Sequence, residues 1–305
     1  MLIGRGYTEI GKGDLRWAVA FTPRLWCSAF VQHGLVVDTR LIAASEDPPR
    51  PAGCLYLVLA GCFTTHGDAS EAFEASSAFV ASDEQLDGSS GSRPLTFSAV
   101  GDPYAAIELH LETVDMRILP GRTPRRITLD ESTWEAARAV GRLSEHDDDA
   151  FEATIERLLE CLVSGGVIAA SAAQRMLEPT PTAFALLWRA LRPMVERLYL
   201  TPTLQEVGDA TGMSVRQIDR YVQDFVSSFA LVGQGWRPAT RYLRLKLAAI
   251  FLSAEGATVT DVARAVGYRS SDAMARAFRD AKMRSPTQLQ RDLRASGQGV
   301  KSPLV

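Results

Sequence analysis

Two stretches of the sequence match each other: TLQEVGDATGMSVRQIDRYV at residues 203–222 and TVTDVARAVGYRSSDAMARAF at residues 258–278. Each contains a short amphipathic segment, a glycine followed by an apolar residue, a serine, and a second amphipathic segment. The two glycines, Gly212 and Gly267, lie 55 residues apart. A glycine between two short helices can adopt the positive φ that ends one helix and turns the chain toward the next. The duplication therefore predicts two helix-turn-helix units in the C-terminal third of the chain.

The first unit also carries the sequence signs of helix starts. Thr203 and Glu206 have the spacing of a capping box, in which each side chain bonds the backbone N–H of the other residue. Ser214 and Gln217 repeat that spacing before the second segment. We therefore expect two short helices that begin after Thr203 and Ser214.

The second helix of each unit is predicted to have an inward and an outward side. Apolar residues four positions apart are expected to face inward: Ile218, Val222, Met274 and Phe278. Met213 and Tyr268 are expected to pack between the helices of their units. The outward side then carries mostly polar groups suited to base edges and phosphates: Arg216, Gln217, Asp219, Arg220 and Gln223 in the first unit, and Ser271, Asp272, Ala275, Arg276 and Arg279 in the second.

The segment RYLRLKLAAIFL at residues 241–252 predicts a helix that joins the two units. About 14 helical residues at about 1.5 Å each would span roughly 20 Å. With the width of each unit added, the two outward helices could enter successive major grooves about 34 Å apart. One hairpin of two helices could be a mere packing motif, but two copies at this spacing favour a DNA-reading role.

The residues from Gly256 to Arg291, including VTDVARAVGYRSSDAMARAFRDAKMRSPTQLQ, resemble the signature of the AraC/XylS family of bacterial transcription regulators. RPATRYLRLKL resembles that family's linker helix, and the likeness covers roughly Pro193 to Arg294. It implies a DNA-binding domain of seven helices, with recognition helices at about residues 214–223 and 270–280. By position, it implies base contacts from six residues: Arg216, Gln217, Arg220, Ser271, Asp272 and Arg276. Together with the outward sides, this gives our predicted DNA contacts: Arg216, Gln217, Asp219, Arg220, Ser271, Asp272, Arg276 and Arg279.

Two features depart from the family pattern. The stretch FVSSFALVGQGW at residues 225–236 makes the link between the units longer than is usual in the family. Asp219 and Asp272 place carboxylates, which repel phosphate, on the outward sides. We expect Asp272 to accept from a cytosine amino group, and Asp219 to form a salt bridge with Arg216 or Arg220.

The N-terminal half has a different pattern. Between residues 15 and 111, short apolar runs such as CLYLVLAGCF and LVVDTRLIAA alternate with Gly-, Pro- and Ser-rich turns, which predicts an antiparallel sandwich or barrel. The family resemblance implies a cupin-like barrel that binds a small effector or dimerises. Aromatic residues on these runs could line a ligand pocket but are more typical of a core: Trp17, Trp26, Tyr56, Phe63 and Phe97.

Helical periodicity begins after residue 120. A helix is expected around Trp134, and a second one shows an apolar stripe from Phe151 to Leu162 and ends near Gly165. This stripe packs on its own domain or forms a dimer interface. EPTPT at residues 178–182 is typical of a junction, and Pro193 is expected in the first turn of a new helix.

The predicted fold is multi-domain α+β. We divide it into an N-terminal β-rich domain, cupin-like barrel or sandwich (residues 1–120), a helical connector (121–185), an all-α double helix-turn-helix domain (186–296) and a disordered tail (297–305). The net charge of the chain is −3, but the C-terminal third is net positive and the remainder net negative. Positive charge gathers where phosphates would bind.

The sequence does not favour an enzyme, a metal site or a bound cofactor. It lacks the nucleophile-elbow, P-loop and dinucleotide-binding motifs, and His33, His66 and His110 are isolated. Four scattered cysteines suggest reduced core thiols: Cys27, Cys54, Cys62 and Cys161. The N-terminus lacks the layout of a signal peptide and no long apolar run occurs, so we expect a cytoplasmic protein that does not use a membrane.

The resulting hypothesis is a sequence-specific transcription regulator that binds double-stranded DNA. Its further partners would be an unidentified small effector, RNA polymerase or a second copy of the chain. The alternative is a protein-interaction or effector-binding module whose C-terminal helices do not read DNA. Binding to DNA would weaken steeply with salt, whereas binding through apolar contacts would not.

Overall fold

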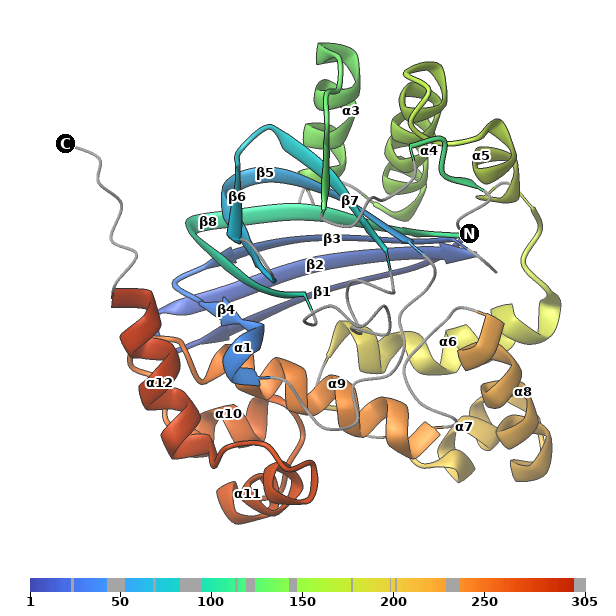
Figure 1. Cartoon of the computed structure of the whole chain (residues 1–305). Helices are drawn as coiled ribbons and strands as arrows, with labels where there is room; N and C mark the ends of the chain where they lie inside the picture. Colours follow the sequence, from blue (N-terminus) through green and yellow to red (C-terminus); the bar gives the residue numbers. More distant parts are fainter. Residues whose placement is uncertain are drawn as a thin grey trace.

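The computed structural model describes residues 1–22, 25–42, 53–67, 70–82, 95–112, 115–118, 124–142, 147–176, 178–197, 199–200, 202–228 and 236–298. The described elements form three layers, in which a β-sheet lies between a small group of helices and a larger helical layer (Figure 1). The small group comes from the middle of the chain and the larger layer from its C-terminal part.

The sheet is antiparallel and contains most of the N-terminal half. Its described strands are β1 (Leu2–Ile10), β2 (Gly13–Thr22), β3 (Leu25–His33), β4 (Val37–Asp38), β5 (Gly53–His66), β6 (Ser70–Glu74), β7 (Ser77–Ser82), β8 (Thr96–Leu111) and β9 (Arg125–Ile127). They are ordered β1-β2-β3-β8-β5-β7-β9, with β4 paired to β8 and β6 paired to β5. The β-rich N-terminal domain predicted from the sequence is thus confirmed.

Alternating side chains give the sheet two buried faces. On β5, Leu55 and Leu57 pack toward the small helical group, whereas Cys54 and Tyr56 belong to a core shared with the larger helical layer. A sheet covered on both faces must bury both sets of a strand's side chains, which explains the nearly continuous apolar run of β5. Tyr56 and Phe63 are core residues, at 1% and 3% exposure.

Some strands differ from the sequence prediction. Except for their outermost residues, Leu95 and Glu112, the runs at residues 95–100 and 105–112 lie in one long strand, β8 (Thr96–Leu111). Among the described residues of the predicted strand LVVDTRLIAA, only the two of β4 form a strand, and helix α1 (Thr39–Ile42) begins directly after them. Strands β1 and β6 were not predicted, because polar and glycine residues interrupt their apolar pattern.

Of the helices that the structure describes, three cover one face of the sheet: α3 (Glu131–Gly141), α4 (Asp148–Ser164) and α5 (Ala170–Met176). Asp130 and Asp147 cap the first two by accepting backbone N–H bonds. The apolar stripe of α4, from Phe151 to Leu162, is buried against this sheet face. The stripe therefore packs inside its own chain and does not form a dimer interface.

Helix α6 (Thr182–Glu196) follows the junction and runs through Pro193. The prediction that Pro193 starts a new helix was wrong. Proline removes one N–H and disfavours a helix interior, but here it stands one turn from the C-terminal end, where few bonds remain to be lost. Leu187, Trp188 and Leu191 are buried, and this packing keeps the segment helical.

The rest of the larger layer consists of α7 (Leu204–Thr211), α8 (Val215–Ser228), α9 (Trp236–Phe251), α10 (Val259–Ala265), α11 (Ser271–Asp280) and α12 (Pro286–Gln298). With α6, the described residues from 182 to 298 contain the seven helices that the family resemblance implied. Residues 299–305 of the predicted tail lie outside the described residues, whereas 297 and 298 belong to α12. Among the described helices, none has the length and apolarity to cross a bilayer.

Candidate nucleic-acid interface

The first helix-turn-helix unit consists of α7 and α8, and its caps are those that the sequence predicts. The Thr203 backbone N–H donates to Glu206 Oε2 at 2.6 Å, and the Glu206 N–H donates to Thr203 Oγ1 at 3.2 Å. Gly212 ends α7 in the left-handed conformation, with φ of 70°. The Ser214 N–H donates to Gln217 Oε1 at 3.0 Å, and the Gln217 N–H donates to Ser214 Oγ at 3.3 Å. These bonds set the angle at which α8 leaves the turn.

Helix α8 has the predicted inward and outward sides. Ile218 and Val222 are buried at 0% and 1% exposure. The predicted contact residues of this helix are all exposed: Arg216, Gln217, Asp219 and Arg220. Gln217 Oε1 accepts the capping hydrogen bond from the Ser214 N–H. The amide nitrogen of Gln217 is therefore the group that remains to donate a hydrogen bond to DNA. Arg220 lies over the Tyr221 ring, 5.0 Å from its centroid, and this contact limits its freedom.

The salt bridge expected for Asp219 was wrong. Among the described side chains, Asp219 makes no ion pair, and its Oδ2 accepts a hydrogen bond of 3.4 Å from Gln223 Nε2 one turn later. Neighbours four residues apart meet on a helix surface, so the amide satisfies the carboxylate locally. Arg216 and Arg220 consequently keep their charge available on the outward side.

The second unit consists of α10 and α11, and it repeats the capping box, the serine cap and the turn glycine of the first unit. The Asp261 N–H donates to Thr258 Oγ1 at 3.1 Å, and the Thr258 N–H donates to Asp261 Oδ2 at 3.3 Å. Ser270 caps α11 by accepting from the Ala273 N–H at 3.1 Å. Gly267, between the helices, has φ of 81°. The capping box of this unit was missed in the sequence, because Asp261 stands where glutamate is more usual.

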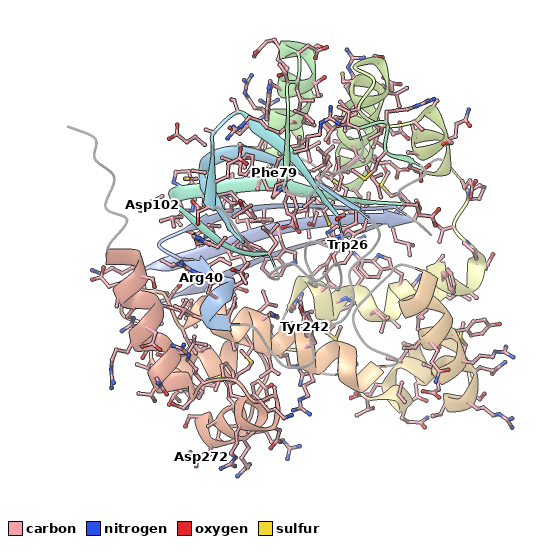
Figure 2. The ribbon with its side chains drawn as sticks, viewed as in Figure 1. Trp26, Arg40, Phe79, Asp102, Tyr242 and Asp272 are labelled. Carbon is pink, nitrogen blue, oxygen red and sulfur yellow. The ribbon has the colours of Figure 1, made fainter. Side chains whose placement is uncertain are left out.

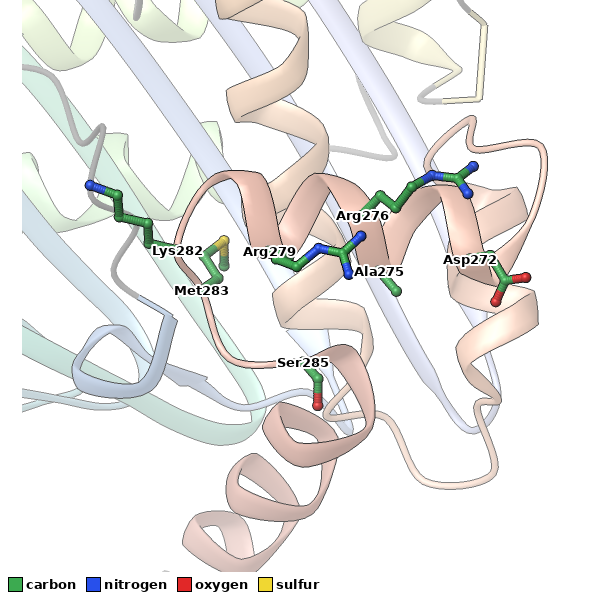
Figure 3. A pocket seen from close by; sticks show the side chains of 7 residues that line it. All are labelled: Asp272, Ala275, Arg276, Arg279, Lys282, Met283 and Ser285. Carbon is green, nitrogen blue, oxygen red and sulfur yellow. The ribbon is translucent and has the colours of Figure 1, made fainter.

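Helix α11 borders a surface hollow of about 590 Å³ (Figure 3). Seven residues line the hollow: Asp272, Ala275, Arg276, Arg279, Lys282, Met283 and Ser285. Met274 and Phe278, on the opposite side of α11, are fully buried. The predicted contacts Asp272, Arg276 and Arg279 thus share one concave surface, with Ser271 half-buried at the helix start.

Lys282 and Ser285 were not predicted as contacts. Lys282 lies two residues after Asp280, the last residue of α11. Ser285 directly precedes Pro286, the first residue of α12. The Gln288 N–H donates to Ser285 Oγ at 3.4 Å. The Ser-Pro pair was a usable signal, because serine caps helices and proline is favoured in the first turn. Both residues extend the concave surface from α11 to α12.

The longer link between the units is explained in part by helix α8. This helix continues to Ser228, and α9 starts at Trp236, so residues 225–228 and 236 of the added stretch are helical. Residues 229–235 lie outside the described residues. The predicted joining helix is confirmed and is longer than expected, with 16 residues.

The first unit contacts the sheet through α6. The Trp188 indole N–H donates to the Ile3 carbonyl at 3.0 Å, and the Trp17 indole N–H donates to the Val195 carbonyl at 3.2 Å. A Cβ on Gly4 would lie 2.9 Å from the Trp188 ring, so this position in β1 needs glycine for the close approach. The sheet therefore holds α6, and α6 packs on α7 and α8 in one apolar cluster.

The second unit contacts the same sheet at another place. The Lys12 N–H donates to the Glu255 carbonyl at 2.8 Å, and the Val36 N–H donates to Ser253 Oγ at 2.8 Å. Apolar residues of α9 to α12 share one continuous core with the sheet, with Phe251, Phe278 and Tyr56 among its members. Figure 1 shows the two units at opposite ends of the helical layer, with α9 between them.

Two helix-turn-helix units, each with two exposed arginines on its second helix, define a DNA-binding transcription regulator. Residues 207–292 match the model of a family described as a helix-turn-helix domain. The matched range runs from within α7 to within α12, so it includes the turns and second helices of both units that the sequence predicts.

Solved structures of regulators resemble the chain loosely. Apo ToxT from Vibrio cholerae shares 10% identity at a TM-score of 0.38, over 87% of this chain and 97% of ToxT. The AraC-like transcriptional activator CuxR shares 15% identity at a TM-score of 0.30, over 84% of this chain and 86% of CuxR. A cupin superfamily protein from Desulfitobacterium hafniense shares 11% identity at a TM-score of 0.23, over 34% of this chain and 82% of that protein. No curated protein matches the sequence.

Proposed function

We propose that this regulator reads a specific, asymmetric DNA site with α8 and α11 in two successive major grooves. The observation that carries the proposal is the duplicated arrangement of capped helices, each with a buried apolar side and an exposed basic side. No carboxylate of the described residues forms an ion pair with Arg216, Arg220, Arg276 or Arg279. Exposed guanidinium groups without a carboxylate partner are suited to guanine edges and phosphates.

The concave surface at α11 suggests separate roles for its residues. Arg276 and Asp272 extend from the first two turns of α11 and would contact base edges, arginine at guanine and aspartate at a cytosine amino group. Arg279 and Lys282 lie toward the end of the helix and would contact phosphates, with Ser285 as an additional donor (Figure 3). In the first unit, Arg216, Gln217 and Arg220 would read bases.

The N-terminal domain is proposed to regulate this reading. It contacts both units, through α6 at one end and through α9 and Glu255 at the other. A change in the sheet domain, caused by an effector or by a second copy of the chain, would then alter the relative placement of the recognition helices. RNA polymerase would be a further partner of an activator, and a regulator of bacterial genes would work in the cytoplasm.

The test is a selection of bound fragments from a genomic DNA library by the full-length protein. We expect a motif with two half-elements about 10 base pairs apart. Arg276→Ala should weaken binding to the selected site by about 1–3 kcal/mol. Its affinity for DNA of random sequence should change little, because a base contact carries sequence information. Arg264→Ala is the matched control, since Arg264 is exposed in the last turn of α10 and does not line the hollow.

An equal loss on all sequences would make Arg276 a phosphate contact. If no sequence is enriched at low salt and the affinity for DNA does not depend on salt, the DNA-reading proposal is contradicted. The protein-interaction alternative would then account for the exposed helices.

A further inference from the structure

A thiol, an imidazole and a carboxylate meet on the sheet face that covers the helical layer. Cys54 Sγ lies 3.2 Å from His110 Nδ1, and His110 Nε2 lies 3.5 Å from Glu108 Oε2. Cys54 and His110 are direct partners in the pairing of β5 with β8, although 56 positions separate them in sequence. The Trp26 ring stacks on the imidazole at 5.0 Å between centroids. The order of groups is that of a nucleophile, its base and an orienting carboxylate.

The groups around His110 favour the charged form of its imidazole. Burial alone lowers the pKa of His110, but the charge of Cys54, its hydrogen bond and Glu108 outweigh burial and raise the pKa to about 10. Cys27 provides a contrast inside the same sheet. Cys27 is equally buried, no imidazole of the described residues bonds it, and burial raises its pKa well above the ordinary value. Of these two thiols, Cys54 is the one with an imidazole within hydrogen-bond distance, which can take up the thiol proton and leave the nucleophilic thiolate.

The cluster also lies where the sheet meets both DNA-reading units. Cys54 belongs to the core that the sheet shares with α9 to α12. Trp26 packs against the apolar cluster of α6, α7 and α8. In Figure 2, Trp26 lies on the side of the sheet that faces the helical layer, far from Asp272 on α11. A change of volume at Cys54 would therefore act on the contacts of both units.

One polar group in this cluster has no partner among the described residues. The Trp26 indole nitrogen is buried and makes no hydrogen bond there. A buried donor without a partner costs free energy, so a bound molecule with an acceptor oxygen beside Trp26 would recover that cost. Aromatic rings on the same face, including Tyr56, make the remaining surroundings apolar. These features favour a small apolar molecule that carries a carbonyl group, once the sheet and the helical layer have separated locally to admit it.

We propose that Cys54 is a modification site for small α,β-unsaturated carbonyl compounds, and that its alkylation weakens DNA reading. Cys54 Sγ attacks the β-carbon and forms a C–S bond, while the C=C electron pair moves toward the carbonyl as an enolate. His110 then donates its proton to the enolate. The net change is addition of the thiol across the double bond, with no oxidant and no leaving group. The effect on DNA reading rests on the proposed function, whereas the reactivity of Cys54 does not.

The packing explains why such an adduct would matter. Cys54 is fully buried, and the His110 and Glu108 side chains are 8% and 21% exposed. A reagent therefore reaches the thiol when the sheet and the helical layer separate locally. The added atoms do not fit a close-packed core, so the modified protein cannot restore the original contacts. Alkylation thus holds the domain junction in an altered state.

The first experiment measures reactivity without DNA. Native full-length protein is treated with N-ethylmaleimide, an unsaturated imide, between pH 6 and 8, and the modified cysteine is identified by peptide mass spectrometry. An ordinary thiol should react about 75-fold faster at pH 8 than at pH 6, given a pKa of about 8.5. We expect Cys54 to be the modified cysteine and its rate to depend on pH much less steeply, because His110 lies within hydrogen-bond distance and can take the thiol proton. An unmodified Cys54 beside a modified Cys62, or an ordinary pH dependence, would overturn the proposal.

Variants of the cluster test the roles of its members. His110→Asn should restore the steep pH dependence, and Glu108→Gln should do so in part. Glu108 is partly exposed, so Glu108→Gln keeps the test informative if His110→Asn does not fold. Cys27→Ser is the matched control and should leave the rate at Cys54 unchanged. Wild-type pH dependence in both His110→Asn and Glu108→Gln would show that neither residue activates the thiol.

The second experiment measures DNA binding after modification. Alkylated wild-type protein should bind the selected site at least about tenfold more weakly than untreated wild-type protein. The Cys54→Ala variant should bind this site with the same affinity before and after treatment. Unchanged binding by fully alkylated protein would overturn the regulatory half of the proposal. Failure of untreated protein to bind any DNA would contradict the proposed function instead, and the mass spectrometry result would stand independently.

Discussion

The two helix-turn-helix units have the same local design but different supports. Both have a capping box, a glycine with positive φ in the turn and a second helix with a buried apolar pair. The second unit shares its core with the β-sheet, so Phe278 and Tyr56 belong to one continuous cluster. The first unit has a small core of its own, which reaches the sheet mainly through Trp188 of α6 and Leu2.

This difference indicates which unit can move at lower cost. Displacing the second unit would expose the apolar core that the sheet shares with α9 to α12. Displacing the first unit would expose only the small cluster around α6. Because hydrophobic stabilisation scales with the apolar area buried, we infer that α7 and α8 form the more adjustable half of the DNA-reading surface. A signal from the N-terminal domain would act most easily on that half.

The largest expected effect comes from a change in the shared core. Phe278→Ala should destabilise the protein by about 3–5 kcal/mol, because it removes a fully buried ring and leaves a cavity. Denaturant unfolding measures the loss, and hydrogen exchange should show reduced protection in the sheet as well as in α10 to α12. Reduced protection confined to these helices would contradict a shared core.

A corresponding change in the first unit should act more locally. Ile218→Ala should cost about 2–5 kcal/mol in the stability of its own cluster. We expect faster hydrogen exchange in α6, α7 and α8, with strands β3, β5 and β8 unaffected. If these central strands also lose protection, the two units are equally coupled to the sheet and the proposed difference does not exist.

The capping hydrogen bonds allow equivalent substitutions in the two units, with a smaller expected loss of stability. Thr203→Ala and Thr258→Ala remove equivalent capping hydrogen bonds, and each should cost about 1 kcal/mol. Thr203→Ser and Thr258→Ser are the matched controls, since serine retains the hydroxyl group. Thermal unfolding followed by circular dichroism measures all four variants. A loss in only one unit would show that the two capping boxes are not equivalent.

Acidification should produce the smallest effect. The Thr203 backbone N–H and hydroxyl lower the pKa of Glu206, and the Thr258 hydroxyl and backbone N–H lower the pKa of Asp261. A lowered pKa in the folded state stabilises the protein above the unfolded pKa of about 4, and this contribution is lost as the pH falls through the folded value. Carboxyl titration by NMR should find both groups below their ordinary pKa. Glu206→Gln and Asp261→Asn should flatten the decline in stability below pH 5.

Local features of the DNA-binding domain could be read from the sequence, whereas contacts between distant segments could not. The caps at Thr203 and Ser214 and the buried pair Ile218 and Val222 follow from spacing within one helix. The hydrogen bond from Trp188 to Ile3 joins residues 185 positions apart, and no local pattern encodes it.

The same limit applies to the thiol cluster, to one incorrect prediction and to one question that the sequence left open. His110 looked isolated in sequence, because strand register alone brings it beside Cys54. Pro193 suggested a helix start, but the tertiary packing of α6 outweighed the local preference of proline. The apolar stripe of α4 was compatible with two partners, and the position of the sheet decided between them.

The most direct test of two-groove reading is the affinity for the selected site after about five base pairs, roughly half a helical turn, are inserted between its half-elements. Because α9 joins the units with a continuous helix, we predict that the insertion reduces affinity to the level of a site with only one half-element. Arg220→Ala and Arg276→Ala should each remove the contribution of one half-element. Unchanged affinity after the insertion would contradict the account, because the two helices would then not read successive grooves on one face of the DNA.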